Sequence, residues 1–167
     1  MLIRPATTAD FDALRTIELA AFETLRAVGA VSGVPSASSD QQLQRYLDSG
    51  FLDVACDHSG DAIGFCGGYI AEHLLHIGEM DVHPNWQRQG VGRALLTAAL
   101  DRARAQNLEG ATLTTDRFAP FNAPFYATMG FRPLADDGLP GRLREILNEE
   151  AKNGLNPDRR IAMMLRF

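Results

Sequence analysis

The chain has 167 residues, a formal net charge of −5 and a pI near 5.3, so we expect a single domain over residues 1–167 with a substantial core. An acidic chain argues against nucleic-acid and anionic-membrane partners, and no apolar run is long enough to span a bilayer. The N-terminus lacks a signal-peptide pattern, and Cys56 and Cys66 lack metal-ligand spacing, so we expect a cytoplasmic protein with two buried, reduced thiols.

The first 50 residues predict one strand and two helices. Residues 2–5 read as a short strand, and Thr7 to Asp10 offers capping residues for an amphipathic helix. A loop rich in Gly, Pro and Ser follows at residues 28–39, and a second, short helix is expected at residues 40–48. The apolar positions of the first helix are Phe11, Leu14, Ile17, Leu19 and Phe22.

The next thirty residues, about a fifth of the chain, predict strands. Residues 51–56 and 62–70 are apolar on either side of a polar turn, which indicates a hairpin. Gly67 and Gly68 inside the second strand predict a bulge or a close backbone approach. A further strand is expected at residues 74–82, after a turn at Glu72 and His73.

The stretch from Asp81 to Leu96 reads D-V-H-P-N-W-Q-R-Q-G-V-G-R-A-L-L and joins that strand to a helix expected at residues 90–106. Glycine lets a ligand approach the backbone closely, and the first amides of a helix have no partner within it. The helix dipole adds partial positive charge there, so the two glycines predict a cradle for a pyrophosphate. Arg88 and Arg93 flank this cradle and can add charge-assisted hydrogen bonds.

Two common nucleotide-binding loops do not fit this stretch. No Gly-Lys-Ser/Thr triplet is present, and Leu95 stands where a dinucleotide fingerprint needs its third glycine. The pattern Gln87-x-x-Gly90-x-Gly92 instead resembles the acetyl-CoA pyrophosphate loop of the GCN5-related N-acetyltransferases (GNAT). An ordinary tight strand-to-helix turn is the alternative reading.

A second stretch, F-N-A-P-F-Y-A-T-M-G-F from Phe121 to Phe131, is similar to the second signature of the same family. Before it, residues 111–115 read as a β-branched strand, which we expect to pair in parallel with the strand ending at Val82. After it, the sequence predicts an extra helix between about residues 140 and 154, followed by a last strand at residues 159–167. That helical insert departs from the usual family pattern and leaves the shape of the acceptor pocket open.

The resemblance implies an α/β fold whose mixed, mostly antiparallel sheet has about six to seven strands, with helices on both faces and a V-shaped splay beside the fourth strand. It implies an acetyl-CoA-dependent N-acetyltransferase that acetylates a primary amine of a small molecule or peptide by direct attack in a ternary complex, without a metal. The segment of the first helix, the loop at residues 28–39 and the second helix would form a wall of the acceptor site. A solvated linker at residues 36–39 is the alternative. The residues expected at acetyl-CoA are Met80, Val82, Gln87, Arg88, Gln89, Gly90, Val91, Gly92, Arg93, Asn122 and Tyr126.

Acetyl transfer to an amine needs a proton acceptor, because alkylammonium groups have pKa values near 10. Glu79 and Asp81 alternate along the expected strand, so both can lie on one face, and Glu72 is a more remote candidate. An acid within an apolar strand is costly unless it is paired or functional, so Glu79 is the first choice as base and Asp81 the second. A satisfied acid at a strand edge is the alternative. The opposite set, Gly78, Met80 and Val82, should pack on the core.

The departing thiolate needs a proton, and the resemblance makes Tyr126 its donor. A phenol is protonated at neutral pH and can donate to sulfur as negative charge develops. The alternative is an aromatic side chain that anchors the helix. Asn122 matches the family position that hydrogen-bonds the pantetheine arm, and it also suits the N-cap of a helix at residues 123–129. The backbone amides of Met80 and Val82 would polarise the thioester carbonyl and pair with the pantetheine like an added strand.

The histidines do not predict a metal site, because His73 and His76 would lie on opposite faces of a strand with no cysteine nearby. A different class of function also fits the same fold, namely a non-catalytic acyl-CoA sensor or regulatory module. Glu79 together with Tyr126 favours catalysis. The sequence names no particular amine and leaves the oligomeric state open, a homodimer included.

Overall fold

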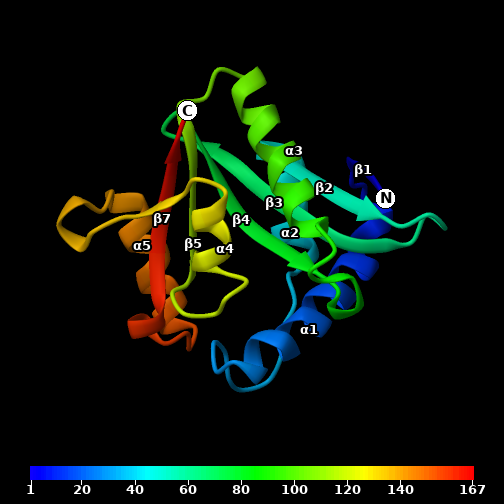
Figure 1. The fold of residues 1–167 in the computed structure, drawn as a ribbon, viewed down its shortest axis with the longest axis horizontal. Coiled ribbons are helices and arrows are strands. Elements are labelled where there is room, and N and C mark those ends of the chain that lie inside the picture. Colours follow the sequence, from blue (N-terminus) through cyan, green and yellow to red (C-terminus); the bar gives the residue numbers. More distant parts are fainter.

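The computed structural model describes all 167 residues, and its seven strands form one sheet in the order β1-β2-β3-β4-β5-β7-β6 (Figure 1). Every neighbouring pair of strands is antiparallel except β4 and β5. The strands are β1 (Leu2–Pro5), β2 (Gly50–Cys56), β3 (Ala62–Ala71), β4 (Leu74–Val82), β5 (Gly110–Asp116), β6 (Arg132–Pro133) and β7 (Arg160–Arg166). The helices are α1 (Phe11–Ala27), α2 (Asp40–Ser49), α3 (Val91–Ala105), α4 (Ala123–Thr128) and α5 (Gly141–Lys152). The mixed, mostly antiparallel sheet expected from the sequence is confirmed.

Helices α3 and α4 cover one face of the sheet, which is the near face in Figure 1. Apolar residues of α3 recur at helical spacing, so one side of the helix packs on β2 to β5. The buried apolar residues of α3 are Val91, Leu95, Leu96, Ala99, Leu100 and Ala103. Together with Tyr126 and Phe131 they build the larger of two apolar cores.

Helices α1 and α2 cover the opposite face and enclose the smaller core. Leu14 and Leu43 are fully buried there against Val54 and Phe65 of the sheet. The expectation that Leu19 belongs to the apolar side of α1 is wrong, because Leu19 is 40% exposed and Ala21 is buried instead. Helix α5, predicted from the sequence as an insert, lies on this same face beside β5 and β7, with Leu143 buried.

The parallel pairing of β4 with β5 is short. Leu75, His76 and Ile77 pair with residues 111–113, and beyond Ile77 the two strands separate. The expected V-shaped splay beside the fourth strand is therefore present, between the second half of β4 and the end of β5.

A β-bulge sits at the point where the splay begins. The register of β3 and β4 shifts between Gly67 and Gly68, so that Gly67 pairs with Glu79 and Gly68 with Ile77. Gly78 is the extra residue, and a side chain there would meet the Tyr46 hydroxyl of α2 at 2.5 Å. The expectation that Gly78 faces the apolar core with Met80 and Val82 is wrong for this reason: the extra residue changes which face the strand presents. Met80 and Val82 do pack on the larger core.

We predict that Gly68→Ala destabilises the protein by about 2 kcal/mol or more, because the new methyl group has no room. A Cβ at Gly68 would lie 2.2 Å from the backbone oxygen of His76 and 2.8 Å from the ring of Phe51. Gly141→Ala is the matched control, since nothing lies within 4 Å of that Cβ and alanine favours a helix. Urea unfolding of both variants measures the effect, and equal midpoints would contradict it.

Candidate active site

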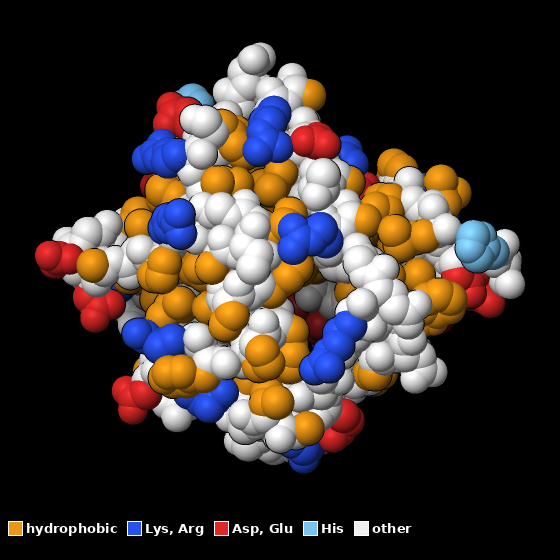
Figure 2. All heavy atoms as spheres, in the orientation of Figure 1, with side chains coloured by type: hydrophobic (Ala, Val, Ile, Leu, Met, Phe, Trp, Pro, Cys, Tyr) orange, Lys and Arg blue, Asp and Glu red, His pale blue; other side chains and the backbone are white.

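Three carboxylates meet on the α1 side of the sheet at the splay. After the bulge, the side chains of Glu79 and Asp81 both point toward the helices, as their alternate spacing predicts. One carboxylate oxygen from each of them and one from Glu18 of α1 lie within 4.8 Å of one another. Seen from the α3 side, Figure 2 shows a hollow near the middle of the molecule, with acidic atoms at its base and basic side chains at its rim.

Burial and mutual repulsion keep these acids partly protonated. Burial raises the pKa of Asp81 to about 7, with a contribution from the neighbouring Glu18. Burial and the adjacent Asp81 raise the pKa of Glu79 well above its usual value. Carboxyl groups this close ionise as a unit, so the pair retains a proton near neutral pH. Because folding raises the pKa values of these acids, their contribution to the free energy of unfolding is present at low pH. That contribution is lost as the pH rises through the pKa values of the folded state.

Glu18 was missed by the sequence analysis, although it lies one helical turn after the buried Leu14 and so on the buried side of α1. Its carboxylate accepts hydrogen bonds from the amide and the hydroxyl of Ser38, at 2.8 and 3.1 Å. Burial nevertheless raises the pKa of Glu18. These bonds fix the loop of residues 28–39 against α1, beside the acids.

Tyr126 approaches the acids from the other side of the splay. Its side chain is 8% exposed and packs edge-on against Phe125 and Phe131, with ring centroids 5.3 and 5.9 Å away. The hydroxyl makes no hydrogen bond within the chain. Burial raises the pKa of this hydroxyl, and Cys66, Asp81 and Glu79 raise it further, so it stays protonated at neutral pH. The ring of Tyr126 packs as an aromatic anchor, and its hydroxyl has no hydrogen-bond partner within the chain.

Asn122 stands at the N-cap position of α4, but its side chain does not cap the helix. Its amide nitrogen donates to the hydroxyl of Thr115 on β5 at 3.0 Å, while its backbone carbonyl accepts from the amide of Tyr126. Asn122 is thus at the N-cap position considered from the sequence, but its side chain bonds to β5 instead of to the helix. The bond to β5 ties the start of α4, and with it Tyr126, to the edge of the splay.

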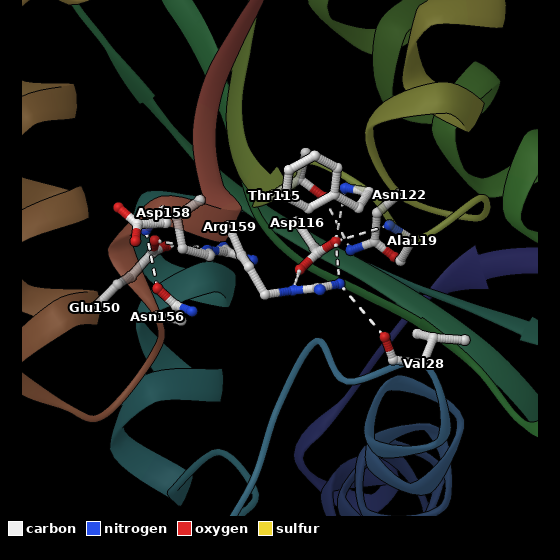
Figure 3. Close-up of polar contacts among 11 residues, drawn as sticks. Val28, Thr115, Asp116, Ala119, Asn122, Glu150, Asn156, Asp158 and Arg159 are labelled. Atoms are coloured by element: carbon white, nitrogen blue, oxygen red, sulfur yellow. Dashed lines mark hydrogen bonds and ion pairs between the residues drawn. The ribbon is translucent and has the colours of Figure 1, made fainter.

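An ion pair that the sequence analysis missed holds the loop before α4 (Figure 3). Arg159 donates to the buried Asp116 at 2.8 and 3.1 Å and to the carbonyl of Val28 at 3.4 Å. Asp116 also accepts from the amides of Phe118 and Ala119. Burial alone would raise the pKa of Asp116, but the hydrogen bonds from Arg159 and the two amides lower it below its usual value. The loop before α4 is thus fixed to the turn that precedes β7 and to the end of α1.

The two-glycine turn forms an open helix N-terminus next to the end of β4. Gly90 has a φ of +86°, which favours glycine, and a Cβ there would meet nothing within 4 Å. Gly92 lies in the first turn of α3 against the side chains of Val82 and Met80, at 3.7 and 3.9 Å from its ideal Cβ. Val91 between them is buried. A helix leaves its first amides without a partner within it, so those of α3 are available for a ligand beside the end of β4.

The polar residues of this turn mostly shape it. The side chain of Gln87 donates to the carbonyl of Val82 at 3.0 Å, and that of Gln89 donates to the carbonyl of Asn85 at 2.9 Å. Arg88 is exposed and has a positive φ of 61°. Arg93 reaches α4, where it contacts the sulfur of Met129 at 2.8 Å and donates to Thr128 at 3.1 Å. Two arginines thus border the cradle, and one of them also links α3 to α4.

The backbone of β4 offers donors toward the opening. The amide of His83 donates to the carbonyl of Ile63 on β3. Because donors alternate between the two edges of a strand, the amides of Met80 and Val82 point to the other edge, where β5 no longer pairs. Pairing of a strand-like ligand with this edge, which the family resemblance implies, stays a prediction.

The sequence model of the acetyltransferase (GNAT) family matches residues 11–131. The chain belongs to this family. The match spans both stretches from which the resemblance was drawn, the two-glycine turn and the segment from Asn122 to Phe131.

Solved structures of GNAT enzymes have the same fold. The ribosomal-protein-S18-alanine N-acetyltransferase of Escherichia coli is 19% identical, with a TM-score of 0.70 over 99% of this chain and 92% of that one. The N-acetylglutamate synthase of Neisseria gonorrhoeae, solved with coenzyme A and N-acetyl-glutamate, is 20% identical, with a TM-score of 0.72 over 99% of this chain and 34% of that one. A putative streptothricin acetyltransferase from Bacillus anthracis, solved with acetyl coenzyme A, is 21% identical, with a TM-score of 0.67 over 99% of both chains.

The GNAT chain brings together some candidates and separates others. Glu72 lies in the turn before β4, away from the other acids, and contacts Arg142 of α5 instead. His83 belongs to the turn before Pro84, as predicted, and accepts from the amide of Asn85. Cys56 and Cys66 are buried and unpaired, also as predicted. None of the helices has the length and apolar character needed to cross a membrane.

If the chain bound a metal ion, the three carboxylates would be its ligands. Hard divalent cations bind carboxylate oxygens, and the oxygens of Glu18, Glu79 and Asp81 are close enough to coordinate one ion. The histidines do not join this set: His73 is exposed in a turn, and His76 is buried against Thr112. That the chain works without a metal stays a prediction.

Proposed function

We propose that the chain is an acetyl-CoA-dependent N-acetyltransferase that acetylates a primary amine by direct attack in a ternary complex. The observation that carries the proposal is the meeting of two kinds of group at the splay: a carboxylate pair that takes up protons near neutral pH, and the unpartnered hydroxyl of Tyr126. A module that only sensed acyl-CoA would need neither group.

The cradle fits the donor. The amides at the start of α3, with Arg88 and Arg93 beside them, would hold the pyrophosphate of acetyl-CoA. Asn122 would hydrogen-bond the pantetheine arm, and the amides of Met80 and Val82 would pair with it and polarise the carbonyl. Acetyl-CoA supplies an activated thioester at the splay.

The chain's own groups then move the protons. The ammonium form of the acceptor first releases one proton to solvent through the Glu79 and Asp81 pair, directly or through water. The nitrogen of the free amine then forms a bond to the carbonyl carbon and loses its second proton to the same pair. The carbon–sulfur bond breaks, and the sulfur takes the proton of Tyr126. A proton returned from the carboxylate pair to Tyr126 restores the resting state.

The proposal is tested by free thiol released from acetyl-CoA with a panel of primary amines, alongside calorimetry of acetyl-CoA binding. We predict that Gly92→Asp abolishes binding, because the carboxylate would occupy the anion cradle. The variant should still fold, since the Cβ makes only ordinary contacts and an acid is favourable in the first turn of a helix. Unchanged affinity would rule out this cradle, and binding without thiol release from any amine would favour the sensor.

We predict that Tyr126→Phe lowers kcat by roughly 10- to 1000-fold, in the range of a single general acid. The KM for acetyl-CoA should change little, because the ring still packs against Phe125 and Phe131. Steady-state kinetics over a range of acetyl-CoA concentrations separates the two parameters. Equal kcat in variant and wild type would mean that water or the acceptor protonates the thiolate.

The proposed base gives a pH dependence. Because the pKa of Asp81 is raised to about 7 and that of Glu79 is raised too, the pair still holds a proton at neutral pH. We therefore expect kcat/KM to rise with pH through the neutral range. Glu79→Gln should lower kcat/KM by about 100-fold or more near neutral pH, and by less at alkaline pH, where more of the amine is already deprotonated.

Asp81→Asn is the matched control for Glu79→Gln, because it makes the same chemical change two residues along β4. The two variants are compared by pH–rate profiles from about pH 6 to 9, which bracket the ionisation of the pair and approach that of the amine. Wild-type kcat/KM in Glu79→Gln across this range would reject Glu79 as the base. Impairment of Asp81→Asn alone would move the role to Asp81.

A further inference from the structure

A second polar cluster lies on the α2 and α5 side of the sheet, nearer the start of β4. Tyr69, His76 and Thr112 stand side by side on β3, β4 and β5. His76 is 3% exposed, its Nδ1 is 3.1 Å from the hydroxyl of Thr112, and its ring lies 5.1 Å from that of Tyr69. Because the bulge restores the alternation after Gly78, this row and Glu79 point to the same side of the sheet.

Two guanidinium groups reach this row from the two helices that flank it. Arg142 of α5 donates from Nη2 to the hydroxyl of Thr112 at 3.1 Å, and its Nε and Nη1 are buried without a hydrogen-bond partner. Arg45 of α2 lies over the ring of Tyr69, with its guanidinium carbon 5.2 Å from the ring centroid, and makes no ion pair. Positive charge from α2 and from α5 therefore converges on the same row.

No group on the row balances the charge of Arg142. The nearest carboxylate oxygen belongs to Glu72 and lies 3.5 Å from Nε, and the Glu72 side chain is 62% exposed. Burial and the charge of Arg142 lower the pKa of His76 to about 3, so the imidazole is neutral. Arg160, also on this side, differs in having two hydrogen bonds to Glu150 at 3.0 and 3.1 Å. Burying a guanidinium group whose N–H donors have no partners lowers the stability of the fold, unless an anion binds to those donors.

We propose that the acceptor is an amino-carboxylate, whose carboxylate binds Arg142 and Arg45 while its amine lies at Glu79 and Asp81. The proposal rests on the function proposed above and names its substrate class. An incoming carboxylate would take the place of Glu72 beside Nε. The guanidinium fork suits a planar carboxylate, and each charge-assisted hydrogen bond adds to affinity.

The geometry also sets the length of the acceptor. His76 and Glu79 are separated by two strand positions once the bulge residue is discounted, which is about 7 Å along β4. An extended chain of about five carbons spans that distance between an amine and a carboxylate. α-Amino acids without a side-chain carboxylate are too short for both contacts.

The test is a series of straight-chain ω-amino acids, from glycine to 6-aminohexanoate, each paired with the n-alkylamine of equal carbon number. Thiol release from acetyl-CoA is measured for the wild type and for Arg142→Gln, Glu72→Gln and Arg144→Gln. Arg144→Gln is the matched control, because it removes the same charge from α5 two residues after Arg142. The Arg144 side chain is exposed and donates only to the carbonyl of Asp136.

If the proposal holds, wild-type kcat/KM favours the longer amino acids over their alkylamine partners by about tenfold or more. Arg142→Gln raises the KM for those amino acids by roughly 10- to 100-fold and leaves the paired alkylamines unchanged, which also shows that the variant is folded. Arg144→Gln changes neither substrate. Glu72→Gln lowers the KM for the amino acids, because the competing carboxylate is gone.

Equal kcat/KM for both members of each pair, or an equal loss for both in Arg142→Gln, would overturn the carboxylate site and leave acetyl transfer intact. If no amine releases thiol, calorimetry of 5-aminopentanoate with the coenzyme A complex decides the matter, and absence of binding overturns the proposal. Failure of the proposed function is distinguishable, because it appears as an absence of acetyl-CoA binding, of thiol release, or of both.

Discussion

The site depends on the single extra residue in β4. The bulge opposite Gly67 and Gly68 coincides with the end of the pairing between β4 and β5, and it turns Glu79 and Asp81 toward α1. The same shift leaves Met80 and Val82 on the larger core, with their amides at the open edge. Without the bulge, the period of two would place the acids in the apolar core beneath α3, where burying their charge would be prohibitive.

Local patterns predicted most of the fold and the two-glycine turn that opens α3. Strand ends, helix starts and the bulge are marked by residues that are neighbours in sequence, such as Gly67-Gly68 and the turn at Gly90. Even so, the side of the sheet toward which Gly78 points was predicted wrongly. Gly67-Gly68 on β3 indicates a bulge, but it does not indicate which residue of β4 is the extra one. The relevant contact, with Tyr46 of α2, comes from a segment more than 30 residues away.

Side chains that reach the site and its supporting loops from distant segments were missed. Glu18 reaches Asp81 from α1, and Arg159 reaches Asp116 from the end of the chain. A polar residue on a buried helix face is a local signal, and for Glu18 it was available. No local signal distinguishes Arg142 from Arg144, since only the seating of α5 on β5 decides which of the two is buried.

On the proposed acceptor site, helix α5 would separate the choice of acceptor from the binding of the donor. The anion cradle and Tyr126 lie with α3 and α4 on one face of the sheet, whereas Arg142 and Glu150 of α5 contact Thr112 and Thr114 on the other. The two faces communicate at the splay, where the sheet has no hydrogen bonds to block passage between them. Residues of α5 can therefore change without disturbing the turn at the start of α3, and on our proposal an insert at this position would let the fold alter its acceptor while keeping its donor.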